Sequence, residues 1–326
     1  MDLFADSAPQ DNVPLAYRMR PKSLDDYVGQ EALVGPGKPL RRMAESGSVR
    51  SMILWGPPGV GKTTLADILA EASGSRLEKL SAVMAGVKEI RAAVERAQEA
   101  RLRERQTLLF LDEIHRLNKS QQDALLPHVE SGLLTLIGAT TENPSFEVNS
   151  ALLSRARVYV LKALDEQALI TVIKRALGDA ERGLGQRDIR ASDEALAILA
   201  RAAAGDARRA LGLLETACDF TGRDDHGETL ERDAVVEVIG HQAAAFDKQG
   251  EHYYDLLSAI HKSIRSSRPD AALLYMAQFM RGGGDPLDVV RRLTAIASED
   301  VGNADPRALP LVIAAWDAYL DRKSVV

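Results

Sequence analysis

Short apolar runs alternate with helix-forming stretches over the first half of the chain. Five runs of strand length lie at residues 52–55, 76–80, 108–111, 133–138 and 158–161. Each is separated from the next by enough residues for a helix. Strands that alternate with helices in this way are typical of a parallel sheet covered by helices. The pattern therefore predicts an α/β fold with a five-stranded parallel sheet.

Beyond Leu161 the apolar residues recur at three- and four-residue spacing, which indicates helices. No strand is expected in this part of the chain. The expected helices fall into two series, separated by a charged interval near residues 246–251: 166–178, 192–203, 206–219 and 231–239, then 252–265, 269–280, 286–299 and 306–320. We expect a flexible leader and three domains: 1–13, 14–162, 163–245 and 246–326.

Composition adds limits on location and partners. With 45% hydrophobic and 27% charged residues, the chain has an ordinary globular composition. Its net charge of −6 excludes a histone-like polycation, so any nucleic acid must be held by a local basic surface. The single cysteine, Cys218, cannot form an internal disulfide, and no signal peptide or membrane-spanning run is present in the sequence. We expect a cytoplasmic protein with no membrane partner.

A nucleotide-binding motif directly follows the first predicted strand. Residues 56–63 read GPPGVGKT and match G-x-x-x-x-G-K-[ST]. Glycines in this motif let backbone N–H groups surround phosphate oxygens at a helix N-terminus, while the lysine neutralises the outer phosphates and the threonine hydroxyl binds Mg²⁺. ATP and Mg²⁺ are the expected cofactors. The predicted nucleotide contacts are Gly56, Pro57, Pro58, Gly59, Val60, Gly61, Lys62, Thr63 and Thr64.

Two adjacent carboxylates, Asp112 and Glu113, end the apolar strand at 108–111. We expect Asp112 to orient the Mg²⁺ shell together with Thr63, partly through water, and Glu113 to polarise the attacking water. Short polar side chains at residues 140–143 follow the next strand, where a hydroxyl can hold a water in line with a phosphate. A simple capped turn is the alternative for these residues.

An arginine pair, Arg155 and Arg157, stands just before the last predicted strand. One arginine at this place can reach a phosphate in a neighbouring subunit and stabilise the charge of the transition state. Surface ion pairing is the alternative explanation for both side chains.

Together with the later Gly205–Arg208 segment (GDAR), these motifs resemble those of AAA+ ATPases of the clamp-loader branch. The resemblance is narrower to the bacterial replication-associated recombination protein A family, also called RarA or MgsA, whose eukaryotic relative is the Werner-helicase-interacting protein. It covers residues 14–320, and the segments that carry it include LDDYVGQ (24–30), SMILWGPPGVGKTTLA (51–66), DEIHRLNKSQQDALLPHVE (112–130), IGATTENPSFEVNSALLSRARVY (137–159) and FDKQGEHYYDLLSAIHKSIR (246–265).

This resemblance implies an AAA+ P-loop NTPase with a helical lid at 163–245 and a helical oligomerisation domain from 246 onward. Members of the family continue with further helical sequence, so the last domain is expected to be shortened. The resemblance places Val28 and Gly29, together with the preceding residues 18–21, beside the adenine, and makes Arg208 the lid arginine that reads the nucleotide state. It also implies a homotetramer that contacts single-strand-binding protein. The catalytic set becomes Lys62, Glu113, Thr141 as sensor and Arg155 as arginine finger.

Two pairs of basic residues are candidates for contacts with DNA phosphates. By resemblance to clamp loaders, the helix start that carries Lys88 and Arg91 faces DNA, and Arg116 and Lys119 form the second pair. A solvated helix face with interleaved acids is the alternative. The leader carries Leu3 and Phe4, which resemble part of a peptide that docks on the sliding clamp, although a tail without function is the alternative.

The sequence thus predicts a DNA-stimulated ATPase that acts at stalled forks or gapped DNA, within the nucleoid. One alternative is a branch-migration motor, but residues 80–107 leave no room for a protruding β-hairpin. A protein unfoldase is disfavoured because residues 82–88 contain no aromatic side chain. The non-enzymatic alternative is a nucleotide-gated scaffold that binds DNA or replisome proteins and barely hydrolyses ATP.

Overall fold

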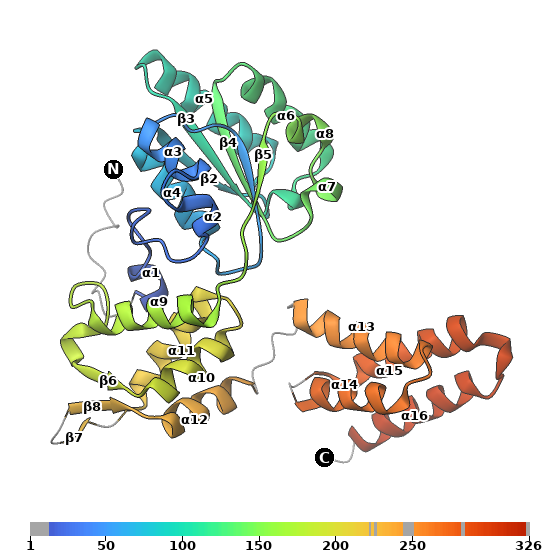
Figure 1. Cartoon of the computed structure of the whole chain (residues 1–326). Helices are drawn as coiled ribbons and strands as arrows, with labels where there is room; N and C mark the ends of the chain where they lie inside the picture. The colour runs from blue at the N-terminus through green and yellow to red at the C-terminus, as the bar shows by residue number, and fades with distance from the viewer. Residues whose placement is uncertain (1–12, 222, 225–226, 244–250, 282–283, 324–326) are drawn as a thin grey trace. The chain divides into compact units, whose positions relative to one another are not determined.

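A computed structural model describes residues 13–221, 223–224, 227–243, 251–281 and 284–323 (Figure 1). The chain divides into two compact units, Met1–Val235 and Val236–Val326. The expected flexible leader at residues 1–13 lies outside the described residues except for its last position. No helix in the described ranges is long and apolar enough to cross a membrane.

The first unit contains the predicted five-stranded parallel sheet, in the order β2-β3-β4-β1-β5. Strand β1 lies between β4 and β5, with Trp55 level with Thr140 on one side and Val160 on the other. This order places the ends of β3, β4 and β1 next to one another, where the candidate nucleotide residues follow. The strands are β1 (Met52–Trp55), β2 (Arg76–Ser81), β3 (Thr107–Asp112), β4 (Leu134–Thr140) and β5 (Arg157–Val160).

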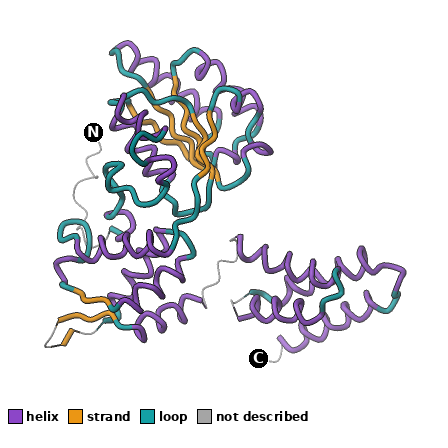
Figure 2. Tube along the Cα trace, viewed as in Figure 1, coloured by secondary structure: helices purple, strands orange, loops and turns teal. Residues whose placement is uncertain are grey.

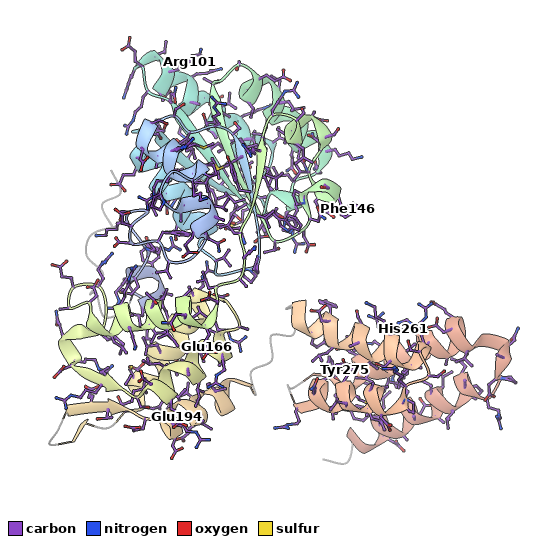
Figure 3. The ribbon with its side chains drawn as sticks, viewed as in Figure 1. Arg101, Phe146, Glu166, Glu194, His261 and Tyr275 are labelled. Carbon is purple, nitrogen blue, oxygen red and sulfur yellow. The ribbon has the colours of Figure 1, made fainter. Side chains whose placement is uncertain are left out.

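Helices cover both faces of this sheet (Figure 2). Alternate strand residues point to opposite faces, and the apolar side chains on each face pack against helices. In β3, Leu108 and Phe110 join the apolar core that includes residues of α3 and α4. Leu109 and Leu111 join a second core with residues of α5 and α6. The helices of this part are α1 (Leu15–Arg18), α2 (Glu31–Val34), α3 (Pro39–Ser46), α4 (Lys62–Ala72), α5 (Val87–Leu102), α6 (Lys119–Glu130), α7 (Pro144–Glu147) and α8 (Ser150–Leu153). Phe146 on α7 is 84% exposed (Figure 3).

Helices also form most of the rest of the first unit, as predicted: α9 (Glu166–Gly178), α10 (Asp193–Ala203), α11 (Ala207–Asp219) and the start of α12 (Arg232–Ala243). A capping side chain begins each of the first three. Asp165, Ser192 and Asp206 accept hydrogen bonds from backbone N–H groups of the first turn, which fixes where these helices start. The only cysteine, Cys218, is buried in α11.

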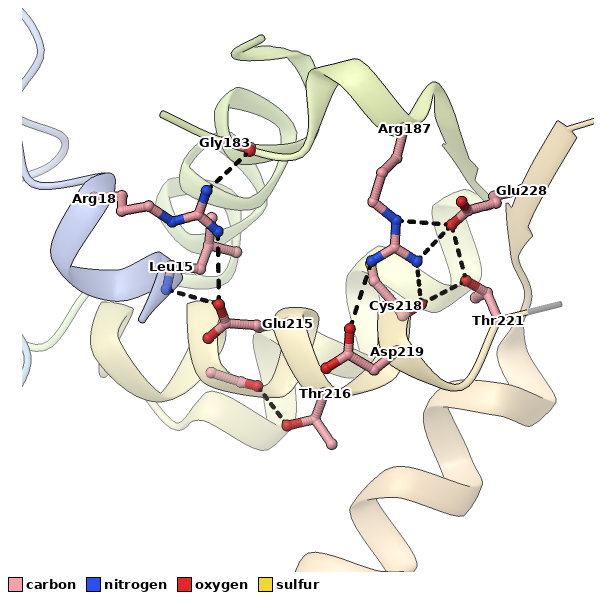
Figure 4. A network of polar contacts seen from close by, with 11 residues as sticks. Leu15, Arg18, Gly183, Arg187, Glu215, Thr216, Cys218, Asp219, Thr221 and Glu228 are labelled. Atoms are coloured by element: carbon pink, nitrogen blue, oxygen red, sulfur yellow. Dashed lines mark hydrogen bonds and ion pairs between the residues drawn. The ribbon is translucent and has the colours of Figure 1, made fainter. Parts of the chain in front are cut away.

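The expectation that no strand follows Leu161 was wrong. A small sheet in the order β6-β8-β7 joins β6 (Ile189–Ala191), β7 (Arg223–Asp224) and β8 (Gly227–Leu230). Its strands have two to four residues, too few for a two-residue alternation to stand out in the sequence. Strand β8 is held by long-range contacts instead, because Arg187 donates hydrogen bonds to Glu228 at 2.6 and 3.0 Å (Figure 4).

The second unit is helical in its described residues, with α13 (Glu251–Arg265), α14 (Pro269–Arg281), α15 (Pro286–Ala295) and α16 (Ala308–Lys323). Its core contains Tyr253, Ile260 and Phe279, with Tyr275 packed against them at the edge (Figure 3). The predicted helix at 286–299 is interrupted, because α15 passes into a π-helical turn at Ile296–Val301. This unit therefore follows the predicted helical pattern apart from that turn.

Candidate functional site

The loop between β1 and α4 takes a conformation that only glycine adopts without strain at two positions. Gly59 has φ +68° and Gly61 has φ +90°. A Cβ on Gly59 would lie 1.7 Å from Asp206 Oδ1, and a Cβ on Gly61 would lie 2.6 Å from Tyr27 Oη. Both glycines are therefore required by backbone angle and by the close approach of neighbours. Helix α4 starts after Gly61 without a capping side chain, so the N–H groups of its first turn are available to an anion.

The side chain of Lys62 folds into this loop. Its Nζ donates to the carbonyls of Gly56 at 2.7 Å and Pro57 at 2.8 Å, and the residue is 8% exposed. Burial lowers the pKa of Lys62, and the nearby carboxylates of Glu113, Asp112 and Asp206 act in the opposite direction. The ammonium is thus held beside the loop in a partly desolvated, acid-lined place.

Asp112 and Glu113 leave the sheet at the end of β3, and Thr141 follows β4. The backbone of Glu113 is in the left-handed region, with φ 54° and ψ 46°, which is a strained conformation for a residue with a side chain. Trp55 Nε1 donates to the Thr141 carbonyl at 3.3 Å and ties the end of β1 to the β4 tip. All three side chains, Asp112, Glu113 and Thr141, line one cavity with Lys62.

This cavity, of about 210 Å³, lies between the α/β part and the helical part of the first unit. Val28 and Arg208, predicted from the resemblance, line it as well. Three predicted contacts, Gly29, Gly56 and Pro57, do not line it, although Gly56 and Pro57 hold Lys62 as described above. The predicted residues that line the cavity are Val28, Pro58, Gly59, Val60, Gly61, Lys62, Thr63, Thr64, Asp112, Glu113, Thr141 and Arg208.

Asp206, which the sequence reasoning used only as part of the GDAR motif, joins the helical part to the phosphate loop. Its carboxylate caps α11, accepting from Arg209 N at 2.9 Å, and lies directly against Gly59. The next residue, Ala207, donates its N–H to the Gly59 carbonyl at 3.1 Å. The start of α11, which carries Arg208, is therefore attached to the loop itself.

Tyr27 also supports the loop, and its role was missed from the sequence. The buried Tyr27 Oη donates to the Val60 carbonyl at 2.7 Å, and burial raises the pKa of this phenol. Arg175, on α9, donates to the Asp26 carbonyl at 2.7 Å and lines the cavity too. Tyr27 lies within LDDYVGQ, so the motif that carries the resemblance was the available signal.

The N-terminal segment also contacts α11 through residues that do not line the cavity (Figure 4). The Leu15 N–H donates to Glu215 Oε1 at 2.9 Å, and Arg18 lies 3.7 Å from the same oxygen. Arg18 was placed beside the adenine together with residues 19–21, but its guanidinium points to Glu215 and Gly183 instead. Met19, Arg20 and Pro21 do line the cavity.

Arg155 lies outside the cavity that the other predicted catalytic residues share. It follows α8, is exposed, and its Nη2 lies 2.6 Å from Glu130 Oε1. It lines a separate groove with Arg42, Arg50 and Arg157. Arg155 therefore does not line the cavity of its own chain.

The four DNA candidates are exposed at neighbouring helix starts. Lys88 and Arg91 lie in the first turns of α5, Lys119 begins α6, and Arg116 precedes it. Gln121 Nε2 donates to the Ala85 carbonyl at 3.0 Å, which joins the start of α6 to the loop before α5. None of the four basic side chains forms an ion pair with another described residue.

The residues that line the cavity fit a nucleotide with a divalent cation. The cavity has a loop that a Cβ would fill, an uncapped helix N-terminus, an ammonium group, and a hydroxyl and a carboxylate at Thr63 and Asp112. Oxygen ligands of this kind suit Mg²⁺. The helices and strands around it define the class, and the chain is an AAA ATPase: residues 52–164 match the model of the ATPase family associated with various cellular activities.

The comparisons also define the family. Residues 184–265 match an AAA C-terminal domain, and residues 266–321 match the MgsA AAA+ ATPase C-terminal domain. Replication-associated recombination protein A of Haemophilus influenzae is 54% identical over 96% of this chain and 70% of its own length, and that of Escherichia coli K12 is 55% identical over 97% and 70%. The chain belongs to the replication-associated recombination protein A family.

More distant matches include a eukaryotic ATPase and a solved structure. ATPase WRNIP1 of Dictyostelium discoideum is 42% identical over 94% of this chain, which covers 36% of that protein. The RuvB Holliday junction branch migration motor of Thermotoga maritima has a TM-score of 0.59 and 26% identity, over 82% of this chain and 92% of that one. In this chain α5 occupies the interval between β2 and β3, and no strand lies between Ser81 and Thr107, a stretch that is described throughout.

Proposed function

We propose that the chain is a DNA-stimulated ATPase of replication and recombination that hydrolyses ATP at interfaces between its own copies. One observation carries the proposal. The phosphate loop, both carboxylates, Thr141 and Arg208 line a single cavity, whereas Arg155 lies elsewhere on an exposed surface. A site that holds nucleotide but lacks its own arginine finger is suited to completion by a second copy.

Each side chain around the cavity has its own role in ATP hydrolysis. The loop N–H groups and Lys62 bind the phosphates, and Val28 lies where the base would be held. Glu113 orients and polarises the attacking water. The hydroxyl of Thr141, at the tip of β4, holds that water in line with the phosphate. Thr63 and Asp112 would hold Mg²⁺, which would neutralise charge on the phosphates. Arg208, on a helix attached to the loop through Ala207, transmits the nucleotide state to the helical part.

Arg155 of one copy would stabilise transition-state charge in its neighbour. Its pair with Glu130 does not prevent this, because both side chains are well exposed and an exposed ion pair contributes little. The adjacent arginines of the same groove, Arg42, Arg50 and Arg157, add positive charge without an acidic lining residue.

DNA would be bound through its backbone by the exposed starts of α5 and α6. Lys88, Arg91, Arg116 and Lys119 supply contacts of the salt-sensitive kind, at forks, gaps or ends in the nucleoid. We further propose a homotetramer and contacts with single-strand-binding protein and the sliding clamp. The leader residues suggested for the clamp, Leu3 and Phe4, lie outside the described residues.

The experiment is ATP hydrolysis with and without forked or gapped DNA, at two protein concentrations that span assembly. We expect stimulation by DNA that is lost in Glu113→Gln and in Arg155→Ala. In mixtures, Arg155→Ala should restore partial activity to Glu113→Gln, because the two defects belong to different sides of one interface. Turnover that is flat with DNA and indifferent to Arg155→Ala would support the nucleotide-gated scaffold instead.

A further inference from the structure

A histidine lies between the tips of β3 and β4. His115 belongs to the short 3-10 turn Ile114–Arg116 that follows the two carboxylates, and its side chain is 9% exposed. Its Nδ1 lies 2.9 Å from Thr140 Oγ1 and 3.3 Å from Glu113 Oε2. One ring nitrogen is therefore in contact with both the proposed water-polarising carboxylate and the end of the sensor strand.

The hydrogen-bond capacities of these groups fix the direction of the contacts. Thr140 is fully buried, and its Oγ1 donates to the Glu142 carbonyl at 3.3 Å while accepting from Glu142 N at 3.0 Å. Its proton is thus engaged, and an ionised Glu113 can only accept. A proton on His115 Nδ1 satisfies these contacts: the N–H donates to Thr140 Oγ1 at 2.9 Å and faces Glu113 Oε2 at an ion-pair distance of 3.3 Å.

Glu113 needs such a partner because little else holds its side chain. Its backbone is in the left-handed region, and its carboxylate is about one-third exposed in the cavity. In the part of the chain that the structure describes, the 3.3 Å contact with His115 Nδ1 is the sole ion-pair contact of this carboxylate. Without that contact, the long side chain would be free to leave the position from which it can reach a water.

We propose that His115 is a positioning residue for ATP hydrolysis: it holds the Glu113 carboxylate in place and ties that position to Thr140, next to the sensor Thr141. This inference rests on the role proposed above for Glu113. His115 does not itself line the cavity, so it acts through Glu113 and has no contact of its own with the nucleotide. Loss of the imidazole should therefore affect turnover and leave nucleotide binding intact.

The rival explanation is that His115 only fills space beneath the turn. Two substitutions separate the explanations, because they differ in where the side chain presents an N–H. The amide nitrogen of asparagine can occupy the place of Nδ1, while the longer glutamine places its amide nearer to Nε2. Glutamine is the closer match to histidine in size, so a space-filling role predicts that the glutamine variant is at least as active as the asparagine variant.

The experiment measures kcat and KM for ATP, with saturating DNA, and the affinity for a fluorescent ADP analogue. We expect His115→Ala to lower kcat by about 10- to 100-fold, the range typical of residues that orient a catalytic group, with KM and ADP affinity within about twofold. His115→Asn should recover most of the loss and His115→Gln little of it. His128→Ala is the matched control, since His128 lies on α6 and its side chain takes no part in the site.

Three results would overturn the inference: an unchanged or raised kcat in His115→Ala, a loss confined to KM, or equal activity in the asparagine and glutamine variants. If His115→Ala does not fold, the asparagine and glutamine pair alone decides. Glu113→Gln distinguishes a failure of the role proposed for Glu113 from a failure of the role proposed for His115. Retained hydrolysis in Glu113→Gln refutes the role of Glu113 and this inference with it, whereas an inactive Glu113→Gln beside an unaffected His115→Ala refutes this inference alone.

Discussion

Replacing Gly59 by alanine tests whether the phosphate loop and α11 are packed as tightly as the geometry indicates. The added Cβ would lie 1.7 Å from Asp206 Oδ1, a distance that real side chains do not reach. Gly59 also has φ +68°, so alanine there is strained even without the clash. The substitution therefore has two costs, and the chain offers a control that isolates one of them.

Gly132 supplies that control. It has φ +67°, nearly the same backbone angle as Gly59, but a Cβ there would meet nothing within 4 Å. Gly132→Ala should cost about 1–2 kcal/mol, the price of a left-handed conformation for a residue with a Cβ. Gly59→Ala should cost roughly 1 kcal/mol more, because the Asp206 carboxylate must move and give up its cap on Arg209 N.

Urea unfolding followed by tryptophan fluorescence measures both costs. The chain has two tryptophans, and Trp316 belongs to the second unit, so a Trp316→Phe background leaves Trp55, at the end of β1, as the reporter. We expect Gly59→Ala to lower the free energy of unfolding by about 2–3 kcal/mol in this background. In the Asp206→Ala background the clash is absent, and Gly59→Ala should cost only about 1–2 kcal/mol.

Tight packing of the Asp206 carboxylate against the loop is refuted if Gly59→Ala is no more costly than Gly132→Ala, or if the costs of Gly59→Ala and Asp206→Ala simply add. Additivity would mean that the carboxylate is not held against the loop. A further consequence is testable in the same samples. Because Ala207 donates to the Gly59 carbonyl, Gly59→Ala should weaken binding of a fluorescent ADP analogue, while Gly132→Ala should not.

Three more predictions follow from single side chains. Tyr27→Phe removes the buried hydrogen bond to the Val60 carbonyl and should lower the free energy of unfolding by about 1 kcal/mol in the Trp55 assay; an unchanged urea midpoint contradicts this. Burial raises the pKa of Cys218 to about 12, so a maleimide at pH 8 should label the thiol only after urea is added, and rapid labelling of the folded chain contradicts it. A hydrogen bond from the Arg182 backbone N–H holds the pKa of Asp179 below its ordinary value of 3.8, so this carboxylate stabilises the fold above that value and the contribution is lost as pH falls through the lower folded pKa. Asp179→Asn should therefore be less stable at pH 7 and lose less stability toward pH ~2, and parallel stability curves for the two proteins would show that the carboxylate charge has no part.

The parallel sheet was predictable because its strands carry their own signal. Residues 108–111 are apolar throughout, and the structure buries them on both faces, so the run could be assigned without knowing its neighbours. The small sheet β6-β8-β7 was not predictable on the same basis. Ile189 pairs with Glu228, and such short strands are stabilised by partners distant in sequence, which no local pattern contains.

The residues of the site also divide into those that local sequence predicted and those that only tertiary contacts revealed. The motif at residues 56–63 is contiguous, and Asp112 and Glu113 follow directly from a strand, so residue type and spacing alone placed them at one end of the sheet. The role of Asp206 against Gly59, and of His115 between Glu113 and Thr140, depends on residues from separate elements. No spacing rule connects them, because their separations along the chain are set by the lengths of intervening helices.

The sequence by itself determined which groups could bind phosphate, Mg²⁺ and water, because those groups sit on continuous segments whose local conformation follows from glycine, strand and helix preferences. Only the tertiary structure decided what holds these groups in place: Tyr27 and Asp206 behind the loop, His115 beside Glu113, and Arg155 on a surface away from its own cavity. Such contacts arise when separate elements pack, and packing depends on the shape of the whole unit and not on any one segment.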